Sequence, residues 1–233
     1  MRPVDPGGSP PWLRSDPMAQ DRPTRQQRSL ATRTAIIEGA AAEFDERGYV
    51  GASMDGIAER IGMTKGALYF HFRSKADMAG AVIAEQHAIS RRYGEAAVAK
   101  GTTPLEWIVW LAQGLAVQMT TEVVVSAGVR LSTDVAASDV DRQDPYTDWT
   151  TVVAGFARQA VDAGEIDPRW DPELVGRVVV RAYTGVQTVS DVMTRRADLF
   201  AGLRELWTVL LDAFVTERLR PEIPRLVALI APE

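Results

Sequence analysis

A short segment around residue 65 gathers side chains that suit contact with DNA. Lys65 offers a cation and Gly66 a backbone position without a side chain, while Tyr69 and Phe70 add aromatic groups one helical turn later. A cation, a bare backbone and an aromatic hydroxyl fit a helix end that enters the major groove. We therefore expect this segment to read double-stranded DNA.

Two short helices must position these groups, and the first begins after Ser53. Ser53 is a favourable N-cap, and Ile57, Ala58 and Ile61 recur at helical spacing on one face. The small Ala58 lets a second helix approach closely. Gly62 ends the helix because glycine readily adopts the left-handed conformation required there.

The second helix follows at once. Thr64 caps it, and we expect Ala67 and Leu68 to face inward. Two helices joined by so short a turn cross steeply, which predicts a helix-turn-helix. The alternative is an ordinary helical hairpin that does not bind DNA.

Composition bounds the remaining chemistry. The 233 residues are 46% apolar, contain no cysteine and have two histidines, which excludes disulfides and disfavours a zinc site. Asp139, Asp141 and Asp144 lack the glycine and closing glutamate of a calcium loop. No glycine-rich phosphate loop or hydrolase motif occurs. We expect no metal, no cofactor and no enzymatic activity.

Charge is distributed unevenly along the chain. The net charge is −5, yet residues 22–75 carry a balance of +3 and residues 104–233 a balance of −7. An acidic body behind a mildly basic head favours DNA contact at one end only. No apolar run reaches the length of a membrane span, and residues 1–6 lack the apolar core of a signal peptide, so we expect a cytoplasmic protein.

Residues 1–27 are predicted to form a disordered arm. Five prolines precede residue 20, without hydrophobic periodicity. Met18 is an alternative start, which would leave a short arm bearing Arg22 and Arg25. Such an arm either touches phosphates or is a solvated tail.

The rest of the chain reads as helices, so the predicted fold class is all-α. Residues 28–75 are expected to form a three-helix DNA-binding domain, and residues 76–233 a helical ligand-binding and dimerisation domain. A strand is not excluded at residues 123–125, and residues 134–148 read as an acidic loop. The predicted helices span residues 30–47, 53–61, 65–72, 74–98, 104–121, 122–131, 145–163, 172–193 and 203–219.

The run Thr64-Lys-Gly-Ala-Leu-Tyr-Phe-His-Phe72, followed by Ser74-Lys75, resembles the recognition helix and connecting helix of the TetR family of bacterial repressors. The resemblance extends upstream to about Ala31. With Glu85-Gln86 and Pro145-Tyr-Thr-Asp-Trp149, the chain is most similar to the γ-butyrolactone autoregulator receptors of actinobacteria. The resemblance implies a dimer that leaves a pseudo-palindromic operator when a small signalling molecule binds, and that controls antibiotic or secondary-metabolite genes.

The resemblance also implies which residues contact DNA. Lys65, Gly66 and Tyr69 would meet bases or nearby phosphates, and the other members of the set would hold the backbone or lie beside it. The full predicted set is Ser53, Met54, Thr64, Lys65, Gly66, Tyr69, Phe70, His71 and Lys75.

Ligand contacts are predicted partly from the resemblance and partly from composition. By resemblance, Trp149 would lie over the ligand, and Gln86 would face the cavity or be a satisfied core amide. Hydroxyls and an amide among the valines of residues 172–193 fit a mostly apolar pocket, or else a dimer seam. Arg130 would pair a carboxylate or lie on the surface. The predicted set is Gln86, Trp107, Leu111, Met119, Arg130, Leu131, Tyr146, Trp149, Tyr183, Thr184, Gln187 and Thr188.

Three functions remain open at this point. The first is a receptor for a γ-butyrolactone, butenolide or furan. The second is a multidrug-sensing repressor of an efflux gene, which would tolerate unrelated ligands. The third is a DNA binder without a ligand. The broad apolar stripe of residues 203–219 and the preceding helix would form a two-fold four-helix interface in a homodimer.

Overall fold

A computed structural model describes residues 25–137, 140 and 145–232. Helices dominate these residues, and the only extended pairing among them is one isolated bridge between Ile166 and Val215. The all-α prediction is confirmed. Most of the expected arm, with Met18 and Arg22, and the three calcium candidates Asp139, Asp141 and Asp144 lie outside the described residues.

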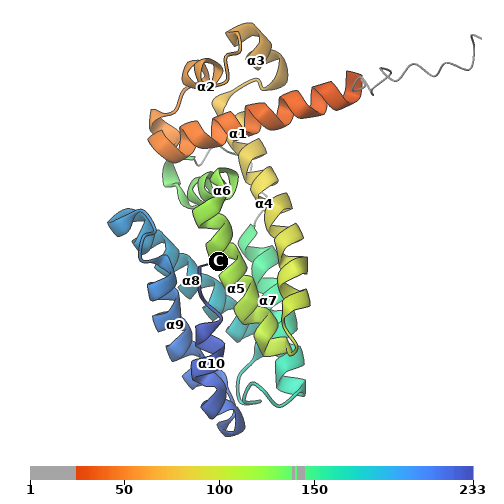
Figure 1. Ribbon diagram of the computed structural model, residues 1–233, viewed down its shortest axis with the longest axis vertical. Coiled ribbons are helices and arrows are strands. Elements are labelled where there is room, and N and C mark those ends of the chain that lie inside the picture. The colour runs from red at the N-terminus through yellow and green to blue at the C-terminus, as the bar shows by residue number, and fades with distance from the viewer. Residues whose placement is uncertain (1–24, 138–139, 141–144, 233) are drawn as a thin grey trace, which may run out of the picture.

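Three helices form what we call the reading head: α1 (Arg25–Gly51), α2 (Met54–Arg60) and α3 (Lys65–His71). In Figure 1, α1 lies across the top of the molecule with α2 and α3 above it. The regular part of α1 stops at Gly48, whose φ of 67° suits glycine. Residues 25–27 are helical, although the sequence placed them in the arm.

One long helix, α4 (Lys75–Lys100), leads from the head into the body. Residues 123–125 are helical, which resolves the strand alternative. The last predicted helix is shorter than expected, because Val215 adopts an extended conformation and pairs with Ile166. The body helices are α5 (Pro104–Thr121), α6 (Val123–Thr133), α7 (Pro145–Asp162), α8 (Pro172–Thr194), α9 (Leu199–Phe214) and α10 (Ile223–Ala228), with 3-10 turns at Val135–Ala137 and Glu217–Glu222.

Hydroxyl and carboxylate caps set the helix starts. The Ser74 side chain accepts a hydrogen bond from the Asp77 amide, and Thr103 does the same for Glu106. Asp171 accepts from two amides of α8. Proline follows at the first position of α5 and α8, where its missing N–H has no role.

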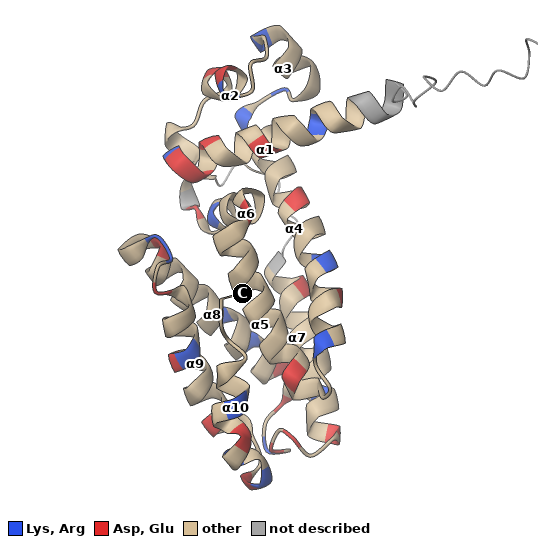
Figure 2. Ribbon diagram, viewed as in Figure 1, with Lys and Arg blue, Asp and Glu red and all other residues tan. Residues whose placement is uncertain are grey.

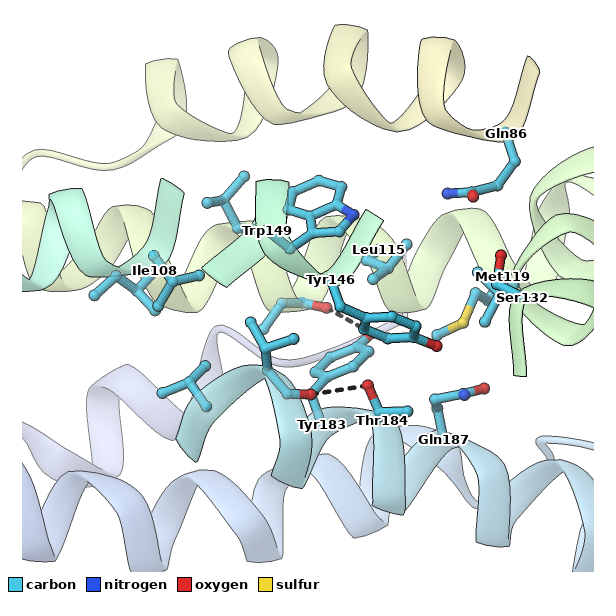
Figure 3. Close-up of a pocket in the computed structure, with 16 residues that line it drawn as sticks. Gln86, Ile108, Leu115, Met119, Ser132, Tyr146, Trp149, Tyr183, Thr184 and Gln187 are labelled. Atoms are coloured by element: carbon cyan, nitrogen blue, oxygen red, sulfur yellow. Dashed lines mark hydrogen bonds between the residues drawn. The ribbon is translucent and has the colours of Figure 1, made fainter. Parts of the chain in front are cut away.

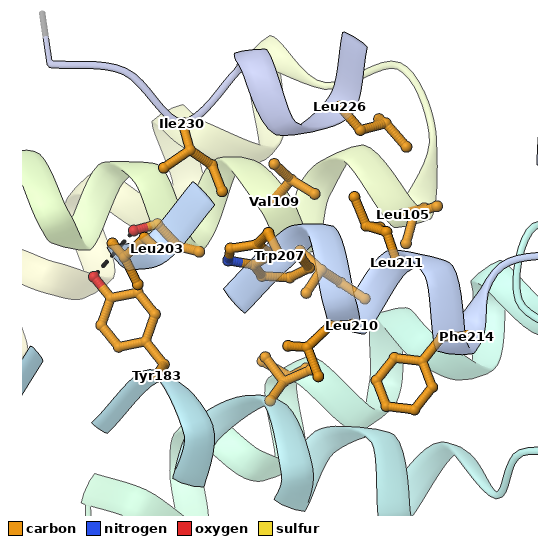
Figure 4. Packing of buried hydrophobic residues seen from close by; sticks show 14 of the residues in the cluster. Leu105, Val109, Tyr183, Leu203, Trp207, Leu210, Leu211, Phe214, Leu226 and Ile230 are labelled. Atoms are coloured by element: carbon orange, nitrogen blue, oxygen red, sulfur yellow. Dashed lines mark hydrogen bonds between the residues drawn. The ribbon is translucent and has the colours of Figure 1, made fainter. Parts of the chain in front are cut away.

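The core of the body lies between α5, α8, α9 and α10. Leu203, Trp207 and Leu211 of α9 are nearly inaccessible and pack against Val109 of α5 (Figure 4). Residues expected to form a loose apolar tail instead fold as α10, and Leu226 closes this core.

A second core belongs to the head, and α6 takes part in it. Val124, Ala127 and Leu131 of α6 pack in one cluster with Ile36 of α1 and Val82 of α4. The head therefore rests on α6 as well as on the covalent link through α4, which matters for any signal that passes between them.

Within the described residues, no single helix is long and apolar enough to cross a membrane. Helices α5 and α6 together have the length and apolar composition of a membrane span, but they are bent by 105° at their junction.

Candidate DNA-reading surface and ligand cavity

The recognition helix α3 presents most of its predicted contacts to solvent. Phe70 is 86% exposed and Tyr69 49%, and Gly66 has no neighbour that an added Cβ would meet. Leu68 alone anchors α3 in the core. Ala67, which the sequence placed inward, is exposed, because so short a helix turns only one narrow face to its support. His71 packs edge-on against Phe70.

Two predicted residues fix the helix starts at this surface. Ser53 Oγ accepts from the Gly56 amide at 3.0 Å, and Thr64 Oγ1 accepts from the Ala67 amide at 3.3 Å. Both side chains remain exposed. The first backbone N–H groups of a helix have no carbonyl partner within it, and such groups are common phosphate ligands.

Two other predicted residues are committed to packing inside the head. Met54 is buried at the start of α2. Lys75 Nζ donates to the Tyr49 carbonyl at 2.7 Å and the Ala52 carbonyl at 3.1 Å, and it lies 4.6 Å from the centre of the Tyr49 ring. Lys75 thus ties the start of α4 to the turn between α1 and α2, a contact that its charge alone did not reveal.

Acidic as well as basic residues lie on the helices of the head (Figure 2), and two of its arginines form ion pairs there. Arg60 of α2 donates to Glu43 of α1 at 3.1 Å and also to Glu46, and this hydrogen bond lowers the pKa of Glu46. Arg47 lies 3.3 Å from Glu43. The Arg60 pairs hold α2 against α1, whereas the Arg47 pair lies within α1. These ion pairs leave the balance of +3 unchanged, but the paired arginines are less available to bind phosphate.

A cavity lies in the body between α4, α5, α6, α7 and α8 (Figure 3). Apolar side chains dominate its wall. Eight of the twelve residues predicted to bind ligand line it: Gln86, Leu111, Met119, Tyr146, Trp149, Tyr183, Thr184 and Gln187.

The other four predicted residues lie outside the cavity. Trp107 packs against Phe156 and donates its indole N–H to the Gly101 carbonyl. Arg130 bonds to the head, and Leu131 is buried in the head core. Thr188 is exposed and accepts from Gln187. The helical faces of α6 and α8 could not be oriented from their apolar patterns alone.

The sequence missed the remaining lining residues. Six of them were within reach, because positions 108, 112 and 115 of α5, 153 of α7, and 179 and 180 of α8 share faces with predicted residues at helical spacing. No comparable pattern indicated Val129 and Ser132 of α6. The missed residues are Ile108, Ala112, Leu115, Val129, Ser132, Val153, Val179 and Val180.

Polar groups gather at one end of the cavity. Gln86, Ser132 and Gln187 lie at this end, and Ile108 lies at the other (Figure 3). Gln86 Nε2 donates to Ser90 Oγ at 3.0 Å, and Ser90 Oγ donates to Gln118 Oε1 at 3.0 Å. This buried chain joins α4 to α5. Gln86 is therefore a satisfied core amide and also part of the cavity wall, which were the two alternatives.

The Tyr183 hydroxyl is already engaged. It donates to the Ala112 carbonyl at 3.1 Å, and burial raises the pKa of Tyr183. The phenol stays neutral at every physiological pH. The Tyr183 side chain therefore contributes an uncharged aromatic ring to the cavity wall. A ligand that fits here is mainly apolar, with one polar end directed toward Gln86 and Gln187.

Apolar side chains remain exposed on the outer face of α8 and α9. Val192 is 78% exposed, Met193 75% and Val209 67%. Such a patch on two neighbouring helices suits self-association about a two-fold axis. Among the described residues, no group of three or more His, Cys, Asp or Glu side chains could hold a metal ion.

Comparisons with known proteins agree with this architecture. Residues 36–82 match the family model for bacterial regulatory proteins of the tetR family, and residues 102–216 match a tetracyclin repressor-like C-terminal domain. The A-factor receptor protein of Streptomyces griseus is 32% identical over 209 residues, which cover 90% of this chain and 70% of that protein.

Two solved structures share the fold over most of their length. A gamma-butyrolactone receptor (ArpA-like protein) is 31% identical with a TM-score of 0.74, covering 87% of this chain and 98% of that one. A structure that gives the molecular basis for control of antibiotic production by bacterial hormones is 37% identical with a TM-score of 0.75, covering 80% and 99%. With two matching family models and these relatives, the chain belongs to the TetR family of bacterial regulatory proteins.

Proposed function

We propose that this chain is a dimeric repressor that leaves its operator when a small diffusible signalling molecule enters the cavity in its body. Helices α1–α3 read DNA, and the remaining helices bind ligand and form the dimer. The ligand is of γ-butyrolactone, butenolide or furan type, and the regulated genes direct antibiotic or secondary-metabolite synthesis. The repressor acts in the cytoplasm. The similarity to the A-factor receptor and the gamma-butyrolactone receptor supports this ligand class.

One observation carries the proposal: the helix that bears the reading head also forms a wall of the cavity. Gln86 lines the cavity eleven residues after the start of α4, whereas Lys75 at that start is bonded to the head. A change in the tilt of α4 at the cavity is thus transmitted along a continuous helix to α1 and α2.

The size of the cavity explains why ligand binding must move helices. Its volume is about 90 Å³, whereas sites for small organic ligands usually enclose about 300–1,000 Å³. A ligand of the proposed class therefore pushes side chains and helices apart. Ligand shifts the equilibrium only if it binds the expanded form better, and a coupling of about 1–3 kcal/mol per site is typical.

On the operator, the two heads of the dimer would enter major grooves about 34–36 Å apart, or a multiple of that distance. Tyr69 and Phe70 are exposed aromatic groups of α3, and Lys65 and Gly66 are exposed at its start. We assign base contacts to this group and phosphate contacts to Ser53, Thr64 and His71.

A gel shift tests the proposal directly. The DNA is the segment immediately upstream of this protein's own gene, with and without an organic extract of the host's spent medium. Specific binding that the extract abolishes supports the signal-receptor function. Release by many unrelated drugs favours the efflux regulator, binding that nothing releases favours a ligandless DNA binder, and absent binding refutes the assignment of the head.

A substitution separates ligand binding from folding. Trp149→Ala should retain operator binding and lose release by the extract, because Trp149 lines the cavity in the body among residues of α4 to α8. Trp107→Ala is the matched control, since it removes an equally large ring that packs beside the cavity on Phe156. Equal loss of binding and release in Trp149→Ala would assign that side chain a structural role.

A further inference from the structure

A cluster of charged and polar side chains lies where the head meets the body, away from α4. It comprises Asp45 of α1, Ser126 and Arg130 of α6, Asp191 near the end of α8, and Arg196 in the turn before α9; we call it the polar junction. An open cleft of about 420 Å³ exposes one side of it. Neither DNA reading nor ligand binding as described above uses these residues.

Arg196 is the centre of the junction. Its side chain is only 5% exposed, although it carries a full charge. One guanidinium nitrogen, Nη1, donates to the Met119 carbonyl at 3.0 Å and to Ser126 Oγ at 2.6 Å, while Nε lies 3.5 Å from Asp191 Oδ1. Burying a charge is unfavourable unless it is paired and hydrogen-bonded, so these partners hold one defined arrangement of α5, α6 and α8.

The backbone of the turn between α8 and α9 adopts an unfavourable conformation at two residues. Arg195 and Arg196 both have positive φ, at 53° and 66°. The left-handed region costs a residue with a Cβ roughly 1–2 kcal/mol, and glycine would avoid that cost. Such conformations persist only where the surroundings enforce them. Here the Arg195 and Arg196 amides donate to the Asp191 and Ser190 carbonyls and cap α8, and the buried hydrogen bonds of the Arg196 side chain add to these contacts.

The junction reaches the reading head through two bonds. Ser126 Oγ, which accepts from Arg196, donates to Asp45 Oδ1 of α1 at 2.6 Å. Arg130 Nη1 donates to the Asp45 carbonyl at 2.5 Å, and Arg130 Nε lies 3.4 Å from Asp191 Oδ2. Asp191 of α8 and Asp45 of α1 are therefore joined twice, once through Arg130 and once through Ser126 and Arg196.

The junction also shares structure with the ligand cavity. The Met119 side chain lines the cavity, while its carbonyl accepts from Arg196. Val129 and Ser132 line the cavity from α6, the helix that carries Ser126 and Arg130. A ligand that expands the cavity pushes α6 away from α5 and α8, and the junction bonds span those three helices.

We propose that the polar junction is a second coupling route between ligand and DNA, parallel to α4, with Arg196 as its positioning residue. Through Ser126 and Arg130 it fixes the angle at which α1 rests on the body. When ligand displaces α6, α1 moves with it. The proposal rests on the proposed function for its ligand response, but the positioning of the head by the junction stands independently of any ligand.

The first test therefore needs no ligand. The chain contains no cysteine, so Val50→Cys in the head and Gln159→Cys in α7 place two spin labels at exposed positions. Labelled chains are mixed with excess unlabelled protein, and the head-to-body distance distribution is measured by electron spin resonance. Ser126→Ala and Arg196→Lys should each broaden or shift the distribution. Thr151→Ala, whose hydroxyl donates to the Thr147 carbonyl within α7, is the control and should leave it unchanged.

The second test measures coupling. The probe is a synthetic γ-butyrolactone with a medium-length alkyl chain, and the coupling factor is the ratio of operator Kd values with and without it. Ser126→Ala should lower this factor roughly three-fold or more, while calorimetric titration shows unchanged binding of the probe. A wild-type protein that ignores the probe counts against the proposed ligand class only. An unchanged distance distribution in both junction variants overturns the positioning role, and an unchanged coupling factor overturns the second route.

Discussion

The Lys65 amine at the start of the recognition helix donates to the Asp55 carboxylate of α2 at 2.6 Å. Both side chains are more than half exposed on the face assigned to DNA. An exposed ion pair contributes little to stability. Its consequence here concerns binding, because Lys65 must exchange a carboxylate for a phosphate or a base, and Asp55 brings a negative charge close to the DNA backbone.

Asp55→Asn should therefore tighten binding to operator DNA and to unrelated DNA by a similar factor, and so leave the ratio between the two affinities nearly unchanged. The substitution removes the competing partner of Lys65 and a charge that repels phosphate. Fluorescence anisotropy over a range of salt concentrations measures both affinities. Glu95→Gln, at an exposed position toward the far end of α4, removes the same charge away from the head and should have little effect. If both substitutions tightened DNA binding equally, the effect would come from the net charge of the protein and not from the position of Asp55.

Tyr69→Ala should weaken operator binding by about 1–3 kcal/mol, or roughly 5-fold to 150-fold, if Tyr69 contacts a base edge. The ring is half exposed on α3 and its loss leaves the anchor Leu68 in place, so the fold should survive. Operator and mismatched sites are compared at one salt concentration. Unchanged affinity for the operator would remove Tyr69 from the reading surface.

Local sequence signals predicted the elements well but not the faces that they turn to their neighbours. The caps Ser53, Thr64 and Ser74 and the stop at Gly62 are local, since each depends on residues within one helical turn. These signals located the helix-turn-helix. The resemblance of the segment ending at Trp149 to known receptors then located the cavity, which Trp149 lines.

The residues whose roles were predicted wrongly, or not at all, bond to partners that are distant in the chain. Lys75 bonds to carbonyls 23 to 26 residues away, and Arg130 bonds to Asp45 across 85 residues. An exposed lysine near DNA and a lysine that tethers two helices have the same local sequence. Arg196 carried no signal at all, because nothing around it in the sequence indicates that α5 and α6 will surround it.

Gly128→Ala tests how closely α6 must approach α4. A Cβ at Gly128 would lie 2.4 Å from Gln86 Cβ and 2.8 Å from Gln86 Cγ, and Gln86 Cβ cannot move without the helix. We expect a loss of about 1–3 kcal/mol in the free energy of unfolding from overpacking, measured by urea denaturation. Gly155→Ala in α7, where an added Cβ meets nothing within 4 Å, should instead gain about 0.5–1 kcal/mol from helix propensity. Similar changes in both variants would mean that α6 and α4 have room to separate.

His87 predicts how stability depends on pH. Burial lowers the pKa of His87 and Arg91 lowers it further, whereas Asp148 opposes them. The folded protein therefore favours neutral His87, while the unfolded chain takes up a proton near pH 6.5. The contribution of His87 is complete above that pH and is lost as pH falls below it, at no more than about 1.4 kcal/mol per pH unit for one proton.

Urea denaturation between pH 7.5 and pH 5.5 measures this loss. His87→Leu should flatten the decline, because the variant has no imidazole at this site that must stay neutral on folding. His71→Leu, on the partly exposed side of α3, removes the other histidine and should keep the wild-type slope. If both variants decline in parallel with the wild type, the acid sensitivity belongs to the carboxylates, and His87 is an ordinary filler of the space between α4 and α7.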